Sequence, residues 1–352
     1  MKNLIYLLVF LSFVGCKQTV QKGVAVTTVE AFPATIELKA GILNVPPVIL
    51  APANMFIYDN QLVIMYNKKP TVFDFFQLPE CQYLYSSGMR GGGPSDLPVH
   101  FDSKFTRATS NGFSVFSPSG LIREYRVDRV NGGKLINCKD QKINLQHLGD
   151  LINGFNMLSD SVFIAWPSVF NHQGYEFVHI NANTNENTLF SAMPQWVDAE
   201  WCKDAQQYFA YFKNTVVHPS ENKFAAFYAF FKQWRIYDNM ELIHDISVHI
   251  PPYSAKVGED VAERMTYYDR SYASEKYIYA ICRNKKYTDD SSLTTELQVW
   301  KWDGTPVAVL LLDKKIACFT ISEKDNKIYA VTSDEGYEDT IYVYSIPEVV
   351  RQ

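Results

Sequence analysis

The stretch Gln61-Leu-Val-Ile-Met-Tyr66 decides the fold, because similar short apolar strands recur five more times along the chain. The further copies are Gly112-Phe-Ser-Val-Phe-Ser117, Ser161-Val-Phe-Ile-Ala-Trp166, Lys223-Phe-Ala-Ala-Phe-Tyr228, Lys276-Tyr-Ile-Tyr-Ala-Ile281 and Lys327-Ile-Tyr-Ala-Val-Thr332. Their starts are separated by 51, 49, 62, 53 and 51 residues. Turn-forming runs introduce most copies, as Tyr58-Asp59-Asn60 does for the first. This period predicts six equivalent units built from hairpins.

A second strand follows each copy, and alternation of its large residues predicts a β-strand rather than a helix. These second strands are Thr71 to Phe76, Ile122 to Val127, Glu176 to Ile180, Gln233 to Tyr237, Glu296 to Trp300 and Thr340 to Tyr344. A third strand follows in the first five units, at Tyr83 to Tyr85, Lys134 to Ile136, Thr188 to Phe190, Leu242 to Ile246 and Val307 to Leu310. The longest interval contains Met193 to Gln207, where we expect an insertion with a short helix.

One more strand upstream of each hairpin, such as Phe105-Thr-Arg or Thr215-Val-Val, brings each unit to four antiparallel strands. Repeats of about 40 to 50 residues with four strands are typical of β-propellers. A two-sheet sandwich, the alternative, does not explain six evenly spaced copies. The sequence therefore predicts an all-β protein, a six-bladed β-propeller of four-stranded antiparallel blades.

The sixth unit lacks a third strand, since the chain ends at Gln352 soon after its second one. An unpaired edge there would invite aggregation. The segment Ala34-Thr-Ile-Glu-Leu-Lys39 precedes the first unit and has the character of an isolated third strand. We expect it to pair with the last blade and close the ring.

Composition supports a large folded domain and excludes some partners. Hydrophobic residues make up 47% of the 352 residues and aromatic residues 14%, which is ample material for a core of strands. The formal net charge of -5 is modest, and the sequence contains no block of consecutive Lys and Arg residues. We therefore expect no nucleic-acid partner.

The first residues are typical of an export signal: Lys2 is followed by an apolar run from Leu4 to Val14 that is too short to span a bilayer. The stretch Phe13-Val14-Gly15-Cys16 resembles a bacterial lipobox, which implies cleavage before Cys16 and lipidation of its thiol. An ordinary signal peptide with a chance cysteine is the alternative. The predicted organisation is a lipoprotein signal peptide at 1–15, a tether at 16–33 and the propeller at 34–352. No acidic run follows Cys16, which favours a periplasm-facing lipid anchor over a surface-facing one.

The loop from Ser87 to Leu97, with Gly91-Gly92-Gly93-Pro94-Ser95-Asp96 at its centre, is similar to the G-x-x-G-x-G-P-x-[ED]-[FYL] loop of the TolB-like six-bladed propeller lipoproteins of Bacteroides and relatives. The likeness extends from about Ala34 to Pro347 and includes Val299-Trp-Lys-Trp-Asp-Gly-Thr-Pro306. It implies a propeller in the cell envelope and assigns no activity.

Two places carry candidate ligand-binding residues. Arg90 and Asp96 flank the glycine-rich turn, where they could pair with each other or face the channel mouth. Arg264, Tyr267, Tyr268 and Arg270 gather near the inner strand of the fifth unit, and aromatic rings beside charged groups suit sugar or peptide recognition. The alternatives are a structural turn and chance clustering in a chain with 22 Tyr.

Metal and hydrolase chemistry find little support. The predicted starts of the inner strands mix basic with polar residues and so interrupt any ring of carboxylates. They are Asp102, Lys104, Asn153, Asn156, Lys213, Asn214, Glu263, Arg264, Lys314 and Lys315. The seven His form no H-x-x-x-H pair, and neither C-x-x-C nor G-x-S-x-G occurs. We expect no metal, cofactor or catalytic residue, and buried single thiols at Cys81, Cys138, Cys202, Cys282 and Cys318.

These features predict a non-catalytic, lipid-anchored binding or scaffolding protein of the cell envelope, with a protein, peptide or glycan ligand at the channel mouth. The alternative is a metal-dependent hydrolase or lyase with its site at the central channel.

Overall fold

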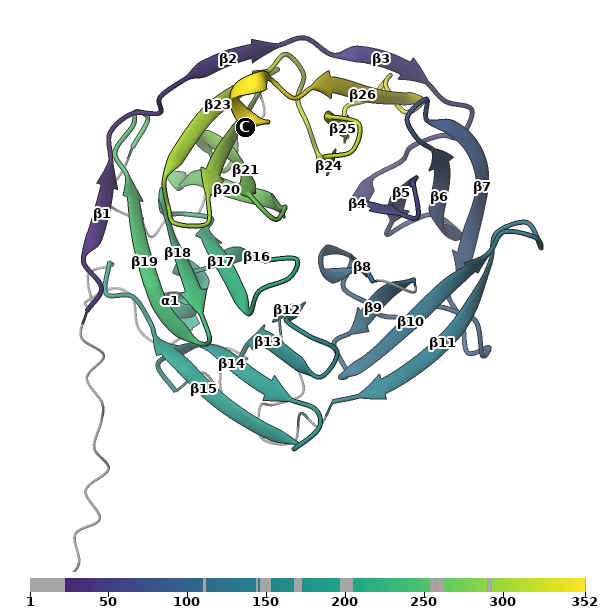
Figure 1. The fold of residues 1–352 in the computed structure, drawn as a ribbon, viewed down its shortest axis with the longest axis horizontal. Helices are drawn as coiled ribbons and strands as arrows, with labels where there is room; N and C mark the ends of the chain where they lie inside the picture. The colour runs from purple at the N-terminus through teal and green to yellow at the C-terminus, as the bar shows by residue number, and fades with distance from the viewer. Residues whose placement is uncertain are drawn as a thin grey trace, which may run out of the picture.

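Six sheets surround a common axis in the computed structural model and confirm the predicted six-bladed β-propeller (Figure 1). The structure describes residues 23–109, 112–143, 145, 153–167, 173–196, 205–253, 257, 263–289, 291 and 293–351. Each blade contains four antiparallel strands; the first in sequence lies innermost in blades one to five, and β24 (Cys318–Ser322) lies innermost in blade six. The last blade takes its fourth strand from the N-terminal part of the chain.

Blade one contains β4 (Pro52–Tyr58), β5 (Gln61–Tyr66), β6 (Thr71–Gln77) and β7 (Gln82–Met89). Blade two contains β8 (Arg107–Ala108), β9 (Phe113–Ser117), β10 (Leu121–Asp128) and β11 (Lys134–Lys142). Blade three contains β12 (Asn153–Met157), β13 (Val162–Trp166), β14 (Tyr175–Asn181) and β15 (Glu186–Ala192). Blade four contains β16 (Lys213–Val217), β17 (Lys223–Tyr228), β18 (Gln233–Asp238) and β19 (Glu241–Val248). Blade five contains β20 (Met265–Ala273), β21 (Tyr277–Lys286), β22 (Thr295–Lys301) and β23 (Pro306–Leu312). Blade six contains β24 (Cys318–Ser322), β25 (Lys327–Val331), β26 (Thr340–Ser345) and β3 (Gly41–Asn44).

Local sequence sets the hairpins within the blades. Tyr58 pairs with Gln61, so Asp59 and Asn60 alone form the turn between β4 and β5. Both have positive φ angles, 48° and 60°, as a two-residue turn of this handedness requires. Asp and Asn tolerate this backbone conformation better than most residues, so the predicted turn signal is the turn itself.

Apolar contacts between blades hold the ring together. One buried cluster fills each of the six interfaces between neighbouring blades, including the interface between blades six and one. Aromatic pairs contribute to these clusters: the rings of Phe116 and Phe155 stack across blades two and three with centroids 3.8 Å apart. Because both faces of each sheet are covered, nearly every residue of β5 and β17 is buried.

The ring is closed by a different segment from the one that the sequence predicted. The prediction that residues 34–39 pair with the last blade is wrong: β2 (Thr35–Leu38) lies parallel to β23 of blade five. The strand that completes blade six is β3, which pairs antiparallel with β26, from Gly41 opposite Val343 to Asn44 opposite Thr340. Both segments are short and alternate between larger and smaller or polar residues. Their sequence patterns therefore do not show which of them pairs with β23 and which with β26.

The pairing with neighbouring blades begins still earlier in the chain. The strand β1 (Val26–Val29) lies parallel to β19 of blade four, although the sequence places these residues in a tether. We call β1, β2 and β3 the N-terminal belt, because they follow the outer rim of blades four, five and six in turn (Figure 1). Phe32, between β1 and β2, packs edge-on against Trp300 at 4.7 Å.

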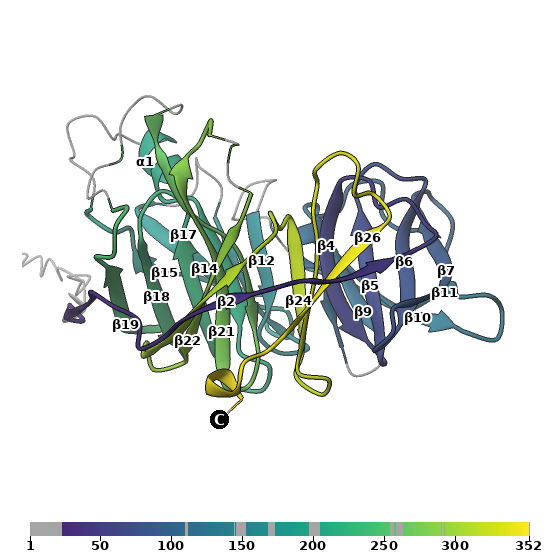
Figure 2. The same ribbon diagram turned by 90° about the horizontal axis from the view of Figure 1, so that it is seen from above.

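Two faces of the propeller are distinguished by what they carry. Figure 2 shows the helix α1 (Ala205–Ala210) on one side, here named the upper face, and the C-terminal turn η3 (Glu348–Val350) on the opposite, lower face. The helix overlaps the end of the insertion predicted at Met193 to Gln207. A further turn, η1 (Ser103–Phe105), leads into β8 at the central axis. Within the described residues, no helix is long and apolar enough to cross a membrane.

Candidate functional site

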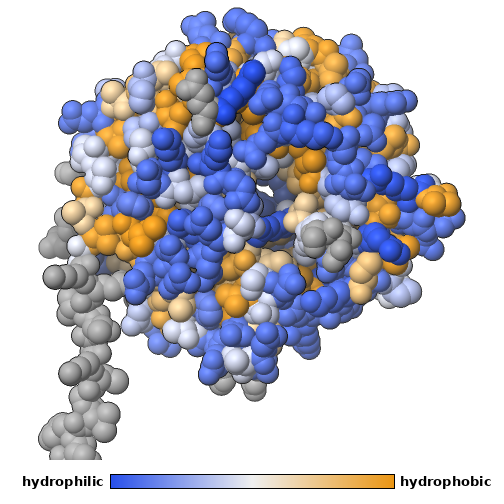
Figure 3. Space-filling view, in the orientation of Figure 1, coloured by the Kyte–Doolittle hydropathy of each residue, from blue (hydrophilic) through white to orange (hydrophobic). Residues whose placement is uncertain are grey.

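Three connected cavities follow the axis of the ring between the inner strands, and together we call them the hub channel. The upper recess, of about 500 Å³, lies among residues of blades five and six. The middle recess, of about 270 Å³, shares Thr266, Asp269 and Tyr287 with it. The lower chamber, of about 330 Å³, shares Lys104 and Asn214 with the middle recess. The view of the lower face in Figure 3 shows an opening at the centre of the ring, surrounded mostly by hydrophilic residues.

An ion pair organises the upper recess. Arg283 donates from Nη2 and Nε to Asp269 Oδ2 at 2.6 and 3.1 Å, and from Nη1 to the carbonyl of Ile316 at 2.9 Å. Burial alone would raise the pKa of Asp269, but Arg283, Arg270 and Lys104 outweigh it and lower that pKa. The carboxylate therefore stays ionised while three cations surround it.

Arg270, a predicted ligand-binding residue, does lie in the upper recess. It donates from Nη1 to the carbonyl of Ala53 at 2.9 Å, which links β20 of blade five to β4 of blade one. Within the described residues no carboxylate lies within ion-pair distance of it. Lys315, in the same recess, pairs with Asp334 at 2.9 Å, so the recess keeps an excess of positive charge.

The aromatic part of the predicted cluster is placed differently. Tyr267 is fully buried between blades four and five, so its ring does not face the channel. Tyr268 is also buried; it donates from its hydroxyl to Gln298 Oε1 at 3.0 Å and contributes to the wall of the middle recess. The guanidinium of Arg264 lies 5.5 Å from the ring centroid of Phe230. The four residues are adjacent in sequence, but only Tyr268 and Arg270 line the hub channel.

Arg90 and Asp96, the other predicted pair, have separate surroundings and form no ion pair with each other. Arg90 donates from Nη2 to the carbonyl of Tyr66 at 3.2 Å and lies over the ring of Phe101 at 4.9 Å. Burial lowers the pKa of Arg90 from its ordinary value. It lines a shallow cavity on the upper face that shares Asp102 and Lys104 with the middle recess.

Asp96 instead holds the glycine-rich loop together. Its Oδ2 accepts from the backbone N–H of Gly93 at 2.8 Å, and the same oxygen lies against the Cα of Gly91, where a β-carbon would collide with it. Its carbonyl accepts from the hydroxyl of Tyr125 at 2.6 Å. The spacing of glycines and acid in this motif therefore has a structural explanation.

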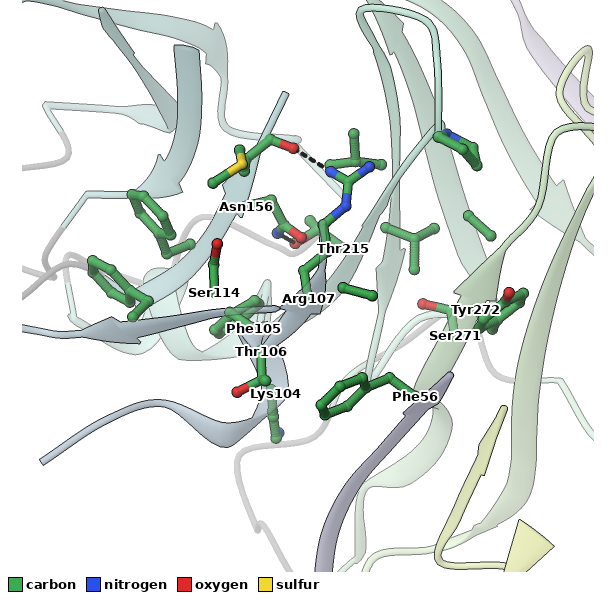
Figure 4. Close-up of a pocket in the computed structure, with 18 of the residues that line it drawn as sticks. Phe56, Lys104, Phe105, Thr106, Arg107, Ser114, Asn156, Thr215, Ser271 and Tyr272 are labelled. Carbon is green, nitrogen blue, oxygen red and sulfur yellow. Dashed lines mark hydrogen bonds between the residues drawn. The ribbon is translucent and has the colours of Figure 1, made fainter. Parts of the chain in front are cut away.

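The lower chamber is lined by Arg107 and several aromatic residues (Figure 4). Arg107, on β8, donates from Nη1 to the carbonyl of Met157 at 2.5 Å. Burial lowers the pKa of Arg107, and no charged neighbour contributes to that shift. Asn156 donates to Thr215 Oγ1 at 2.6 Å nearby. The sequence prediction did not include Arg107, because a two-residue inner strand gives little sign of what its side chains face.

The structure holds a second group of charges that the sequence prediction missed, at the interface of blades three and four. Glu176 precedes the buried Phe177 and Val178 in β14 and is 1% exposed. It accepts from Lys213 Nζ at 3.0 Å, Arg235 Nη1 at 3.1 Å and the Tyr228 hydroxyl at 2.7 Å. An acid directly before the apolar pair Phe177-Val178 in a predicted strand is the signal that could have indicated this buried cluster.

Of the remaining predicted hub residues, Asp102, Lys104, Lys213 and Asn214 line the middle recess, and Asn156 lines the lower chamber. Asp102 Oδ1 accepts from the backbone N–H of Lys104 at 3.0 Å, and Asn214 donates to the carbonyl of Asp269 at 3.1 Å. Glu263 pairs with Lys286 at the surface. Across the described part of the chain, no group of three His, Cys, Asp or Glu could hold a metal ion.

Among the described cysteines, Cys81, Cys282 and Cys318 are buried free thiols, as predicted, but the prediction is wrong for Cys138, which is exposed on the outer strand β11. Burial raises the pKa of the Cys81 thiol to about 12. Cys16 and Cys202 lie outside the described residues.

Fold and site together define this chain as a six-bladed β-propeller with a polar, partly cationic channel at its hub. It is similar to the crystal structure of a member of the DUF4221 family from Bacteroides vulgatus, with a TM-score of 0.58 and 12% sequence identity over 88% of this chain and 98% of the other. It is also similar to a protein described as exported from Bacteroides fragilis, with a TM-score of 0.53 and 8% identity over 92% of this chain and 99% of the other. No family model matches the sequence, and no curated protein matches it. At these identities the likeness establishes the fold alone.

Proposed function

We propose that this chain is an exported, lipid-anchored protein of the cell envelope that binds a ligand in the hub channel without transforming it. The connected cavities of the hub channel carry this proposal. They are lined by charged and amide side chains from several inner strands, as expected of a binding site formed at the centre of a ring of blades.

The location rests on the N-terminal sequence. The apolar run from Leu4 to Val14 and the lipobox-like Phe13-Val14-Gly15-Cys16 support export and lipidation. The similar Bacteroides fragilis protein, described as exported, supports the same compartment. The absence of an acidic run after Cys16 favours the periplasm-facing side.

Two measurements test the proposal. When cells that express the protein are fractionated, the wild-type chain should sediment with the membranes, and the Cys16→Ala variant should remain in the soluble fraction. Recovery of both in the same fraction would contradict lipid anchoring. Pull-down of the tagged chain from envelope extracts should then recover a ligand or partner that is lost when the channel is altered by Arg270→Ala. A partner that binds this variant unchanged would contradict the role of the hub channel.

A further inference from the structure

Arg107 occupies an unusual position for a cation. It projects from β8 into the lower chamber, is half-buried there, and within the described residues has the carbonyl of Met157 as its one protein acceptor. None of the salt bridges of the described chain involves it. A guanidinium carries five N–H donors, so most of its donors are available to the cavity.

Such an arrangement costs stability unless something else neutralises the charge. Removing a cation from bulk water is unfavourable, and proteins normally compensate with a paired carboxylate. The cluster around Glu176 shows that this chain does so elsewhere, since Arg235 contacts both Glu176 and Asp245. Among the described residues no acid pairs with Arg107, and the open cavity in front of it is where an anion would fit.

The apolar residues in the walls of the lower chamber indicate that the anion also has an apolar part. Phe56, Phe105 and Phe155 contribute apolar surface to it, and Ser271 and Tyr272 of β20 lie on the far side of the cavity from Arg107 (Figure 4). A purely inorganic anion would leave this apolar surface unused, whereas a carboxylate on an apolar body would cover it. The volume of about 330 Å³ admits a small organic molecule.

A second cation, Lys104, lies where it can contact the same ligand. Lys104 lies in η1, three residues before Arg107, and lines both the lower chamber and the middle recess. Its ammonium lies 5.6 Å from the ring centroid of Phe212, and none of the salt bridges of the described residues includes it. A ligand that enters through the channel would therefore meet one cation at each level.

From this geometry we infer that the lower chamber binds an organic carboxylate, with Arg107 holding the carboxylate group and the phenylalanine wall holding the apolar body. The inference rests on the proposed function and names its ligand class. Arg107 is the anchoring residue, and Lys104 draws the anion into the channel.

Two probes of equal shape test it: 3-phenylpropanoate and its neutral amide, titrated into the purified protein and followed by saturation-transfer NMR. The acid should bind at least about tenfold more tightly than the amide, since a charge-assisted pair in a partly dry site is worth more than about 1.4 kcal/mol. Arg107→Met should remove that difference and Arg107→Lys should keep part of it. Arg126→Met, at an exposed arginine of β10, is the matched control and should change nothing.

Stability gives a second readout that a purely structural arginine would not produce. Arg107→Met should unfold at the same temperature as wild type or higher, because it removes an uncompensated charge. A marked loss of stability would show that the contact with Met157 is structural and would overturn the inference.

The binding outcomes separate the inference from the proposed function. Equal binding of acid and amide, independent of Arg107, would overturn the carboxylate assignment and leave the channel as a binding site. Absence of binding by either probe at millimolar concentration would overturn the assignment as well. Sulfate that displaces the acid as effectively as a second organic carboxylate would contradict the role of the phenylalanine wall. None of these results bears on envelope association, which Cys16→Ala measures separately.

Discussion

Glu176 of blade three and Lys213 of blade four meet in the interior, where Lys213 Nζ donates to Glu176 Oε1 at 3.0 Å and both side chains are almost completely buried. Arg235 extends the contact to Asp245, with 2.9 Å between Nη2 and Oδ2. The network joins blades three and four through charges, whereas buried apolar clusters fill the other interfaces of the ring. Removing one member leaves the others buried without compensation.

Glu176→Gln should therefore destabilise the fold strongly. The substitution keeps the size of the side chain but removes the charge that compensates Lys213 and Arg235. We expect the free energy of unfolding to fall by about 3 kcal/mol or more, measured by urea titration. Glu241→Gln, at an exposed residue of β19, should change it by less than about 0.5 kcal/mol. Equal effects of the two substitutions would contradict the role of the network.

The same carboxylate predicts how stability depends on pH. Burial alone would raise the pKa of Glu176, but Lys213, Arg235 and the Tyr228 hydroxyl outweigh it and hold that pKa below 4.5, its value in the unfolded chain. A carboxylate with a lowered pKa stabilises the fold above its unfolded pKa and loses that contribution as pH falls through the folded value. The gap in unfolding free energy between wild type and Glu176→Gln should be widest near neutral pH and narrow below about pH 4. A gap that is constant across this range would contradict the assignment.

The N-terminal belt predicts unequal effects of truncation. A chain that begins at Ala31 lacks β1 alone, and blade four keeps its four antiparallel strands. A chain that begins at Val45 also lacks β2 and β3, and the loss of β3 leaves the edge of β26 unpaired. We expect the first to unfold cooperatively near the wild-type temperature and the second to aggregate or unfold at a much lower one. Differential scanning calorimetry with light scattering compares them, and equal behaviour would show that β3 does not close the ring.

The glycine-rich loop offers a matched pair of substitutions. A β-carbon at Gly91 would collide with the Asp96 carboxylate, whereas the space beside Gly92 is open. Gly91→Ala should displace Asp96 from the N–H of Gly93 and cost about 1 to 2 kcal/mol. Gly92→Ala should cost less than about 0.5 kcal/mol. Similar losses from both, measured by urea titration, would mean that Asp96 does not hold the loop.

Much of the fold could be predicted from the sequence. A strand pattern that recurs about every 50 residues indicates structurally similar units, and such units can close into a ring. The belt could not. Thr35–Leu38 and Gly41–Asn44 are both four-residue strands, and which blade each one joins depends on the path of the chain around the rim. Local alternation does not contain that information.

The site could be predicted only in part. Arg270 was predicted from its charge beside aromatic residues, and it lines the upper recess. Tyr267 was predicted for the same reason but is buried, because both faces of a propeller blade are covered and an aromatic side chain on an inner strand can face a neighbouring blade. Arg107 and Glu176 depend on contacts between blades, which sequence proximity does not reveal.

The pairing of β3 with β26 joins the start of the chain to its end. During synthesis, residues 26–44 emerge long before their partners on β19, β23 and β26. Each strand of the belt must therefore wait unpaired until its partner has been made, and β3 waits until nearly the whole polypeptide is finished.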